Sequence, residues 1–295
     1  MPDKLFYIVD VFAEEKYQGN QLAVFRRAGG ISDVEMQLIA QETHYSETTF
    51  IYSDDQRDSG YDVRIFTPVR EVPFAGHPTL GTAYIIYKEI ENGNSDRINL
   101  NLKVGRIPVS VDKSDPDRPL LWMKQNKPEF GKTFDKAAIV ASLNLDVSDI
   151  AEDYPVEEVS TGLPFIIAPL NSLEAVKKAR VNIPKFFDLV ENSEAKAILI
   201  FCPETYRDAN DLNVRVFVDY FNIPEDPATG SANGCLAGYL VRHQYFGDDV
   251  IDIRVEQGYE IGRPSLLLLR AENQEGEIMV YVGGRVVPVA EGKFV

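Results

Sequence analysis

The sequence predicts an α+β protein made of two similar halves, and three observations point to this fold class. Residues 78–83 and 227–232 both match Pro-x-x-Gly-[Thr/Ser]-Ala, and their glycines, Gly81 and Gly230, lie 149 residues apart (230 − 81). Each match runs into an apolar helical pattern. Strand-like segments rich in β-branched and aromatic residues alternate with helical ones along the chain. We therefore expect each half to combine strands with one glycine-marked helix.

The similarity extends to the strands that precede the two helices. Val-Arg-Ile-Phe at 63–66 matches Val-Arg-Val-Phe at 214–217 with an offset of 151 residues (214 − 63), and Phe50 and Phe201 keep that offset. Short motifs can recur by chance. The common order and spacing favour gene duplication with pseudo-twofold symmetry. The change of offset from 151 to 149 then requires a two-residue gap in the loop between strand and helix.

The elements of the first half follow from composition, capping and periodicity. Ser32 and Glu35 form a capping-box pattern that opens a helix ending near residue 43. Apolar, β-rich strands are expected at 5–12, 21–25, 48–52, 61–66, 97–104, 106–111 and 120–123. The first glycine-marked helix is expected to have one apolar face, made of Leu80, Ala83, Tyr84, Tyr87 and Ile90.

The second half repeats this order. Helical patterns occur at 134–143 and 184–190, and the second glycine-marked helix runs to about residue 243. Strands are expected at 197–201, 212–218, 265–270, 278–282 and 285–289. Residues 155–164 are expected to lie between the halves.

The composition restricts the class of function. The 295 residues carry a formal net charge of −16, which argues against nucleic acid and anionic membranes as partners, because both would repel the protein. Cys202 and Cys235 are too few for a disulfide framework, and no Cys/His cluster has metal-ligand spacing. Neither a leader nor an apolar run of membrane length is found. We expect a cytoplasmic protein without a bound metal.

Three side chains at expected element boundaries could carry acid–base chemistry. Glu47 precedes a strand, where a carboxylate with a raised pKa could serve as both base and acid, although a solvated loop glutamate is the simpler interpretation. His77 follows Gly76 at a helix start and could bind a substrate, act as an acid, or only cap and pack. Asp226 could cap the second helix, orient His77, or bind a substrate amine or hydroxyl.

The helix starts themselves favour an anion, because unpaired N–H groups and the positive end of the helix dipole meet there. Gly230 and Ser231 would supply N–H groups and a hydroxyl suited to a carboxylate. A serine nucleophile is disfavoured, because the Gly-x-Ser-x-Gly elbow is missing from the sequence. Cys235 is interpreted as a packed thiol, and His44 and His243 as structural.

Several longer motifs follow one another from residue 5 to about residue 290. They are 19–24 (Gly-Asn-Gln-Leu-Ala-Val), 46–50 (Ser-Glu-Thr-Thr-Phe), 66–68 (Phe-Thr-Pro), 73–81 (Pro-Phe-Ala-Gly-His-Pro-Thr-Leu-Gly), 225–234 (Glu-Asp-Pro-Ala-Thr-Gly-Ser-Ala-Asn-Gly), 256–258 (Glu-Gln-Gly) and 262–265 (Gly-Arg-Pro-Ser). Together they resemble the phenazine-biosynthesis isomerase (PhzF-like) family. One departure is Gln21, where proline is common after Gly-Asn.

This resemblance implies the diaminopimelate-epimerase fold, in which two pseudo-symmetric halves each wrap a curled, mostly antiparallel sheet around a central helix. The halves would span 1–125, completed by a C-terminal strand at 284–295, and 126–283. The active site would lie in the cleft between them. The resemblance also implies a homodimer.

The resemblance further implies a cofactor-free proton shift that isomerises trans-2,3-dihydro-3-hydroxyanthranilate, a small cyclic amino acid. Glu47 matches the glutamate that moves the proton, and His77, Asp226 and Ser231 match the residues that hold the substrate. Racemases and epimerases of the same fold carry one cysteine at each of the two helix starts. Here Gly76-His77 and Gly230-Ser231 stand at those places, which disfavours a two-thiol racemase.

We hypothesise that Glu47 takes a proton from one carbon of the substrate and returns it to another. His77 and Asp226 would stabilise charge on an amine or hydroxyl, while N–H groups at Gly76 and Gly230 hold the carboxylate of a small substrate. Two alternatives stay open. One is a racemase, epimerase or lyase acting on another amino-acid-like compound, and the other is a non-catalytic small-molecule or protein-binding module.

Overall fold

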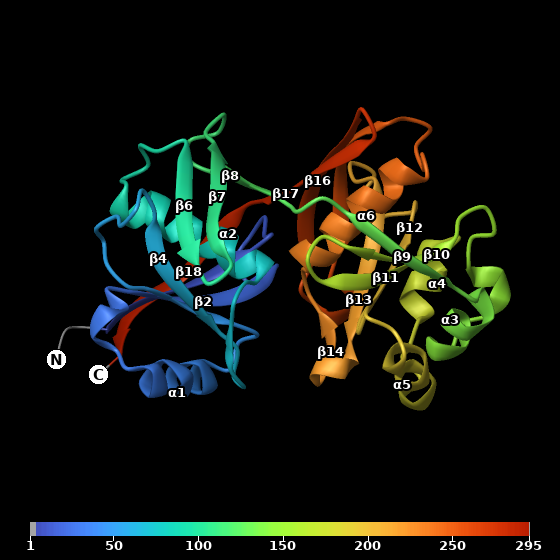
Figure 1. Cartoon of the computed structure of the whole chain (residues 1–295), viewed down its shortest axis with the longest axis horizontal. Helices are drawn as coiled ribbons and strands as arrows, with labels where there is room; N and C mark the ends of the chain where they lie inside the picture. Colours follow the sequence, from blue (N-terminus) through green and yellow to red (C-terminus); the bar gives the residue numbers. More distant parts are fainter. Residues whose placement is uncertain (1–3, 295) are drawn as a thin grey trace. The chain divides into compact units, whose positions relative to one another are not determined.

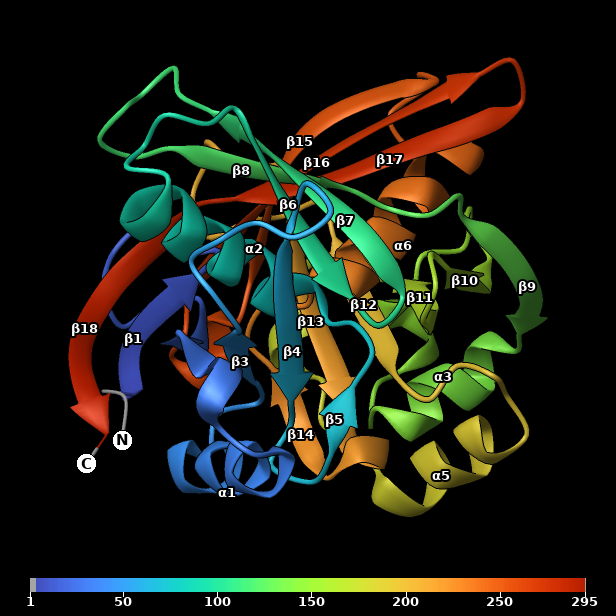
Figure 2. The same cartoon turned by 60° about the vertical axis from the view of Figure 1, so that its left-hand side comes forward.

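The computed structural model describes residues 4–294, and this part of the chain forms two compact units. The first unit contains residues 4–123 and 283–294, and the second contains residues 124–282. The last strand, β18 (Val286–Phe294), belongs to the first unit and pairs antiparallel with β1 (Lys4–Val11), as Figure 2 shows. The chain therefore leaves the first unit, builds the second, and then completes the first sheet.

The first unit is a mostly antiparallel sheet packed against the helix α2 (Gly76–Ile85) (Figure 1). Its other strands are β2 (Asn20–Arg26), β3 (Thr48–Ile51), β4 (Tyr61–Phe66), β5 (Glu71–Val72), β6 (Arg97–Leu102), β7 (Gly105–Asp112) and β8 (Leu120–Lys124). They pair in the order β18–β1–β2–β3–β4–β6–β7–β8, and β5 pairs with the far end of β4. Only β2–β3 and β4–β6 are parallel among these pairs.

The second unit repeats this order around the helix α6 (Gly230–Arg242) (Figure 1). Its strands are β9 (Glu129–Phe134), β10 (Val156–Ser160), β11 (Pro164–Pro169), β12 (Ile198–Cys202), β13 (Leu212–Val218), β14 (Ile223–Asp226), β15 (Val250–Gln257), β16 (Ser265–Gln274) and β17 (Glu277–Gly284). The order is β9–β10–β11–β12–β13–β15–β16, with β14 on the far end of β13. The parallel pairs, β11–β12 and β13–β15, occupy the same places as in the first unit.

An Arg–Glu ion pair at the same place in each sheet marks the two units as copies of one another. Arg64 on β4 forms a two-pronged pair with Glu71 on β5, with N···O distances of 2.8 and 2.8 Å. Arg215 on β13 does the same with Glu225 on β14, at 3.0 and 2.7 Å. These two arginines are also the ones in the matching Val-Arg-[Ile/Val]-Phe runs, so the duplication predicted from the sequence extends to side-chain contacts.

The glycines of the two short motifs are not equivalent, and that part of the prediction is wrong. Gly230 begins α6, whereas Gly81 lies in the middle of α2, which begins at Gly76. Thr79 and Asn233 then match, since each side chain donates to the carbonyl of the residue before its helix. The true offset of the helices is 154 (230 − 76), so the second unit gains three residues before α6 instead of losing two. The 3-10 turn Asp219–Phe221 occupies this connection.

The expectation of a one-sided apolar face on the first glycine-marked helix is also wrong. Every residue of α2 from His77 to Ile85 is buried, and the chain continues as a π-helical segment, Ile86–Ile90. In α6 the run from Ala232 to Val241 is buried. A helix that packs against a curled sheet over much of its circumference has no solvent face and therefore no amphipathic period.

Several elements of the second unit were not expected. Residues 155–164 lie inside this unit, where they contain all of β10 and the first residue of β11, and not between the halves. The strand β10 was not expected because Glu157 and Glu158 interrupt its apolar run. Both are nevertheless buried, and their carboxylates accept hydrogen bonds of 2.7 Å from His243 and of 2.7 Å from Ser193, respectively. β9 is largely exposed, so it lacks an apolar run, and it takes Phe134 from the expected helix.

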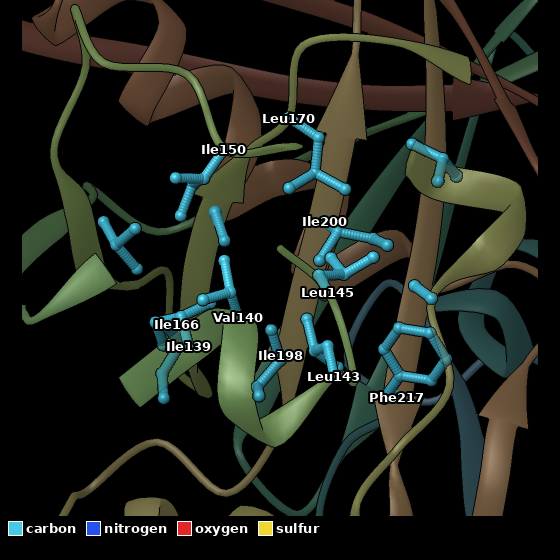
Figure 3. Close-up of a cluster of buried hydrophobic side chains, with 14 of the residues drawn as sticks. Ile139, Val140, Leu143, Leu145, Ile150, Ile166, Leu170, Ile198, Ile200 and Phe217 are labelled. Atoms are coloured by element: carbon cyan, nitrogen blue, oxygen red, sulfur yellow. The ribbon is translucent and has the colours of Figure 1, made fainter. Parts of the chain in front are cut away.

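Further helices cover the outer faces of the sheets. In the first unit α1 (Asp33–Thr43) starts at Ser32, whose hydroxyl accepts from the Glu35 N–H as the capping pattern predicts. In the second unit α3 (Lys136–Ser142), α4 (Leu173–Lys178) and α5 (Ile183–Glu191) enclose an aliphatic core with β11, β12 and β13, shown in Figure 3. Among residues 4–294, none of the helices combines the length and apolar character needed to cross a bilayer.

Candidate active site

Glu47 and His77 meet in the first unit. Glu47 stands at the entry to β3, and His77 is the second residue of α2. Glu47 Oε2 lies 3.4 Å from His77 Nε2, and the two side chains are only 18% and 8% exposed. A hydrogen bond of 2.7 Å between the Thr49 and Thr82 hydroxyls ties β3 to α2 just beyond this pair. The contact thus results from the packing of one strand end against one helix start.

His77 is a neutral imidazole. Burial lowers the pKa of His77 to about 3, and a backbone hydrogen bond with Gln21 opposes this shift only in part. In the described part of the chain, Nε2 has no hydrogen-bond partner, so the bond to the Gln21 carbonyl is made by Nδ1–H. The tautomer follows: Nδ1 carries the proton, and the lone pair of Nε2 faces Glu47.

A tight turn sets the position of the Gln21 carbonyl. Gly19 has a φ of +66°, and a Cβ there would lie 2.3 Å from the Val11 carbonyl oxygen, so only glycine fits. The preceding loop is fixed by Asp10, which is 2% exposed and accepts from the Tyr17 N–H at 2.6 Å. The motif at 19–24 therefore orients His77 through its backbone.

The chemistry of the pair follows from the tautomer. A neutral Nε2 is only an acceptor, and an ionised carboxylate is only an acceptor, so the two repel unless one proton lies between them. Glu47 and His77 can therefore hold one proton in a site from which water is largely excluded. A group that gains and loses a proton in this way has the character of a general acid and base.

The second unit contains a separate polar network at the start of α6. The Thr229 hydroxyl donates to the Asp226 carboxylate and accepts from Gln257 Nε2 at 3.0 Å. Gln257 Nε2 also donates to the Asp226 carbonyl at 2.8 Å. Gln257 Oε1 accepts from the Thr229 N–H at 3.2 Å and from Asn233 Nδ2 at 2.8 Å. Asp226 is therefore held in place by its carboxylate and by its backbone.

Both helix starts are open to an anion. In the described residues no side chain of the N-cap residue closes either helix, and neither first turn contains an acidic residue. The free N–H groups are those of Gly76 and His77 in α2, because the third residue is proline, and those of Gly230, Ser231 and Ala232 in α6. These donors suit a carboxylate.

The two cysteines occupy neither helix start. Cys202 ends β12 and Cys235 is the sixth residue of α6, and both are buried. Burial raises the pKa of each thiol to about 12, so neither is a thiolate at neutral pH. Proton transfer between two thiols is therefore not available to this chain. His44 and His243 are the C-cap residues of α1 and α6, in agreement with structural roles.

Sequence reasoning missed the residues that support the site. The Gln21 carbonyl selects the His77 tautomer, and Gln257 and Thr229 bind Asp226. In the sequence, Gln21, Thr229 and Gln257 were noted only as members of longer motifs, and no role was assigned to them. A backbone carbonyl has no side-chain signature, and a hydrogen bond between residues 226 and 257 depends on the pairing of β13 with β15. The structure thus assigns a physical purpose to the Gly-Asn-Gln and Glu-Gln-Gly motifs.

Comparison with known proteins identifies the family. A family model described as phenazine biosynthesis-like protein matches residues 9–292. The chain belongs to this family. A family relative from Pseudomonas aeruginosa, named trans-2,3-dihydro-3-hydroxyanthranilate isomerase, is 34% identical over 98% of both chains. The resemblance stated from the motifs is confirmed, and the chain is an isomerase of the phenazine biosynthesis-like family.

Solved structures agree with the family and the fold. A Bacillus anthracis structure, titled phenazine biosynthesis protein of the PhzF family, has a TM-score of 0.90 at 26% identity and covers 100% of both chains. A probable proline racemase from Agrobacterium radiobacter has a TM-score of 0.62 at 8% identity, covering 99% of this chain and 93% of its own. The α+β, diaminopimelate-epimerase-like fold class is thereby confirmed.

Proposed function

We propose that this protein isomerises a small, cyclic, amino-acid-like carboxylate by moving one proton without a cofactor, with Glu47 as the acid and base. The observation that carries the proposal is the 3.4 Å contact between Glu47 Oε2 and a buried, neutral His77 Nε2. A carboxyl group beside an acceptor-only nitrogen can both release and recover a proton during one turnover.

The other site residues take binding roles in this proposal. Asp226 would contact the substrate's amine or hydroxyl, and Ser231 and the N–H groups of Gly76 and Gly230 would hold its carboxylate. The protein's charge of −16 makes such local donors necessary, because the molecule as a whole repels an anion. The substrate class comes from the name of the Pseudomonas aeruginosa relative.

Proton NMR in D₂O tests the role of Glu47. Wild type and Glu47→Gln are each incubated with trans-2,3-dihydro-3-hydroxyanthranilate. We expect conversion with deuterium incorporation by wild type, and a rate at least about 10²–10⁴-fold lower for Glu47→Gln, because the amide cannot accept and return the proton.

Glu42→Gln is the matched control, because Glu42 is an exposed glutamate on α1 and should leave the rate unchanged. Comparable rates for wild type and Glu47→Gln would disprove the acid–base role. Absence of turnover by wild type would instead reject this substrate. We also propose a homodimer in the cytoplasm, which sedimentation equilibrium and cell fractionation would test.

A further inference from the structure

Gln257 forms four hydrogen bonds at the start of α6, and we call this set of bonds the Gln257 clamp. Both the nitrogen and the oxygen of its neutral carboxamide take part. Its amide nitrogen donates to the Asp226 carbonyl and to the Thr229 hydroxyl, and its oxygen accepts from the Thr229 N–H and from Asn233. The side chain is fully buried. A carboxamide can satisfy donors and acceptors together without adding charge, which neither glutamate nor lysine can do.

The residues around Gln257 fix its position independently. The preceding residue, Glu256, is buried and accepts four hydrogen bonds, of 2.7 to 3.1 Å, from the loop before β13 and from Asn213 on that strand. The following residue, Gly258, has a φ of +79°, and a Cβ there would lie 2.6 Å from the Pro227 carbonyl oxygen. The Ser265 hydroxyl donates to that same carbonyl at 2.9 Å. The end of β15 and the turn at Pro227 are therefore locked together.

The first unit shows that the fold does not require this clamp. Asn101 on β6 pairs with Asp62, as Glu256 on β15 pairs with Asn213, and Asn101 likewise binds the loop before its partner strand. The residue after Asn101 is Leu102, an apolar side chain in the place of Gln257. Packing of a central helix against its sheet is thus achieved without a carboxamide, and the clamp is an addition specific to α6.

We propose that Gln257 is the positioning residue that holds Asp226 and the N-terminus of α6 in the arrangement that binds the substrate carboxylate, and this rests on the function proposed above. Because the clamp is neutral, it orders the helix start without competing with an anion for the N–H groups of Gly230 and Ser231. A glutamate in the same place would keep the shape but lose both donated bonds and oppose the anion.

The first experiment needs no ligand. Amide hydrogen exchange is compared between wild type and Gln257→Leu, which removes all four hydrogen bonds. We expect the Asn233 N–H, which bonds the Thr229 carbonyl, to exchange at least about tenfold faster, while the Leu236 N–H in the same helix is unchanged. Gln274→Leu, at an exposed position on β16, is the control. Unchanged exchange at Asn233 would overturn the proposal.

The second experiment separates the effect of a disordered helix start from the effect of a negative charge placed at residue 257. Binding of anthranilate, a carboxylated ring with an amine, and of 2-aminobenzamide, its neutral amide, is measured by calorimetry. We expect Gln257→Leu to weaken anthranilate about tenfold, and Gln257→Glu to weaken anthranilate more than 2-aminobenzamide. Equal losses for both probes in Gln257→Glu would contradict the charge argument. Equal unfolding midpoints for wild type and variants would exclude global destabilisation as the cause.

Failure of the proposed function would give a different set of results from failure of the Gln257 clamp. If wild type neither converts trans-2,3-dihydro-3-hydroxyanthranilate nor binds anthranilate, the substrate class is wrong, while the exchange comparison still decides the clamp. If Gln257→Leu does not fold, the isosteric Gln257→Glu provides the same exchange measurement. Loss of the two donated bonds should then accelerate exchange at Asn233, and an unchanged rate would overturn the clamp.

Discussion

His77 carries an imidazole, a side chain that is often exposed and able to take up a proton, but here it is buried in a site that disfavours its charged form. The side chain is buried at the start of a helix, where the positive dipole end adds to the cost of a second proton. Its Nδ1–H has a partner in Gln21, and its Nε2 faces Glu47. The imidazole is therefore a fixed hydrogen-bond acceptor and does not titrate near neutral pH. Of the roles considered from the sequence, this geometry favours binding and packing over that of an acid.

The lowered pKa of His77 makes stability depend on pH. The pKa is about 3 in the folded state against 6.5 for an unperturbed histidine, so the unfolded chain binds more protons between these values. The contribution of the neutral His77 to the free energy of unfolding is fully present above about pH 6.5. It is lost as the pH falls, by about 1.4 kcal/mol per pH unit until about pH 3. Between pH 7 and pH 5 we expect His77 to account for a loss of about 2 kcal/mol.

Urea unfolding of wild type and His77→Asn at both pH values measures this contribution. The variant should lose less stability on acidification than wild type does. His44→Asn is the control, because His44 is an exposed C-cap residue with a φ of 55°, a conformation that asparagine tolerates. Parallel losses in wild type and His77→Asn would show that His77 is protonated in the folded state.

The same residue shows the limit of sequence reasoning. Glu47 and His77 could each be placed at an element boundary from the sequence, and the family resemblance gave both a role. Their contact could not be derived, because it depends on how β3 packs on α2, through Thr49 and Thr82. The preference of Nδ1 for Gln21 was equally hidden, since it depends on a backbone carbonyl.

At the scale of elements, sequence patterns succeeded where a strand is an uninterrupted run of β-favouring residues or where a helix cap is local. Ser32 and the start of α1 are an example, and β4 and β13 were predicted with their observed ends. Patterns failed for β10, whose glutamates are buried in ion pairs and hydrogen bonds. They also misaligned the central helices, because a chance match of six residues aligned Gly81 with Gly230, whereas the Arg–Glu pairs and the helix starts give a different register.

Gly81 has an element-scale role of its own. A Cβ at this position would lie 2.6 Å from Leu22 Cδ2 and 2.8 Å from Val11 Cγ2, so α2 packs directly on β1 and β2 at this point. We expect Gly81→Ala to destabilise the protein by about 1–3 kcal/mol through overpacking, although alanine is the better helix former.

Gly234→Ala in α6 is the matched control, because the atoms nearest to its Cβ would all belong to the Gln125 side chain, the first of them at 3.1 Å. Chemical denaturation of both variants provides the comparison. A Gly81→Ala variant at least as stable as wild type would show that β1 and β2 can move away from the helix at little cost.

At the scale of the whole molecule, duplication allows the same substitution to be made in both units. The Arg215–Glu225 side chains are 5% and 6% exposed, and those of Arg64–Glu71 are 16% and 14% exposed. Removing one partner leaves a buried charge, which costs about 3–5 kcal/mol when solvent cannot reach it. We expect Arg215→Leu to approach that loss and Arg64→Leu to fall below it.

Hydrogen exchange resolved by residue distinguishes the two variants. Protection should fall mainly in residues 124–282 for Arg215→Leu, and mainly in residues 4–123 and 283–294 for Arg64→Leu. A uniform loss of protection in either variant would mean that the units unfold as one body. The duplication itself was visible in the sequence, but the insertion before α6 and the hidden strand β10 needed the structure.

The return of β18 to β1 has a consequence for synthesis on the ribosome. The edge of β1 that β18 covers is made first and covered last, since residues 124–282 are translated in between. Residues 12–285 separate β1 from β18, so at a translation rate of about 5–20 residues per second this strand edge stays uncovered for roughly 14 to 55 seconds. The nascent first unit therefore presents an open strand to other chains during that interval, and a truncation before residue 286 would leave it open permanently.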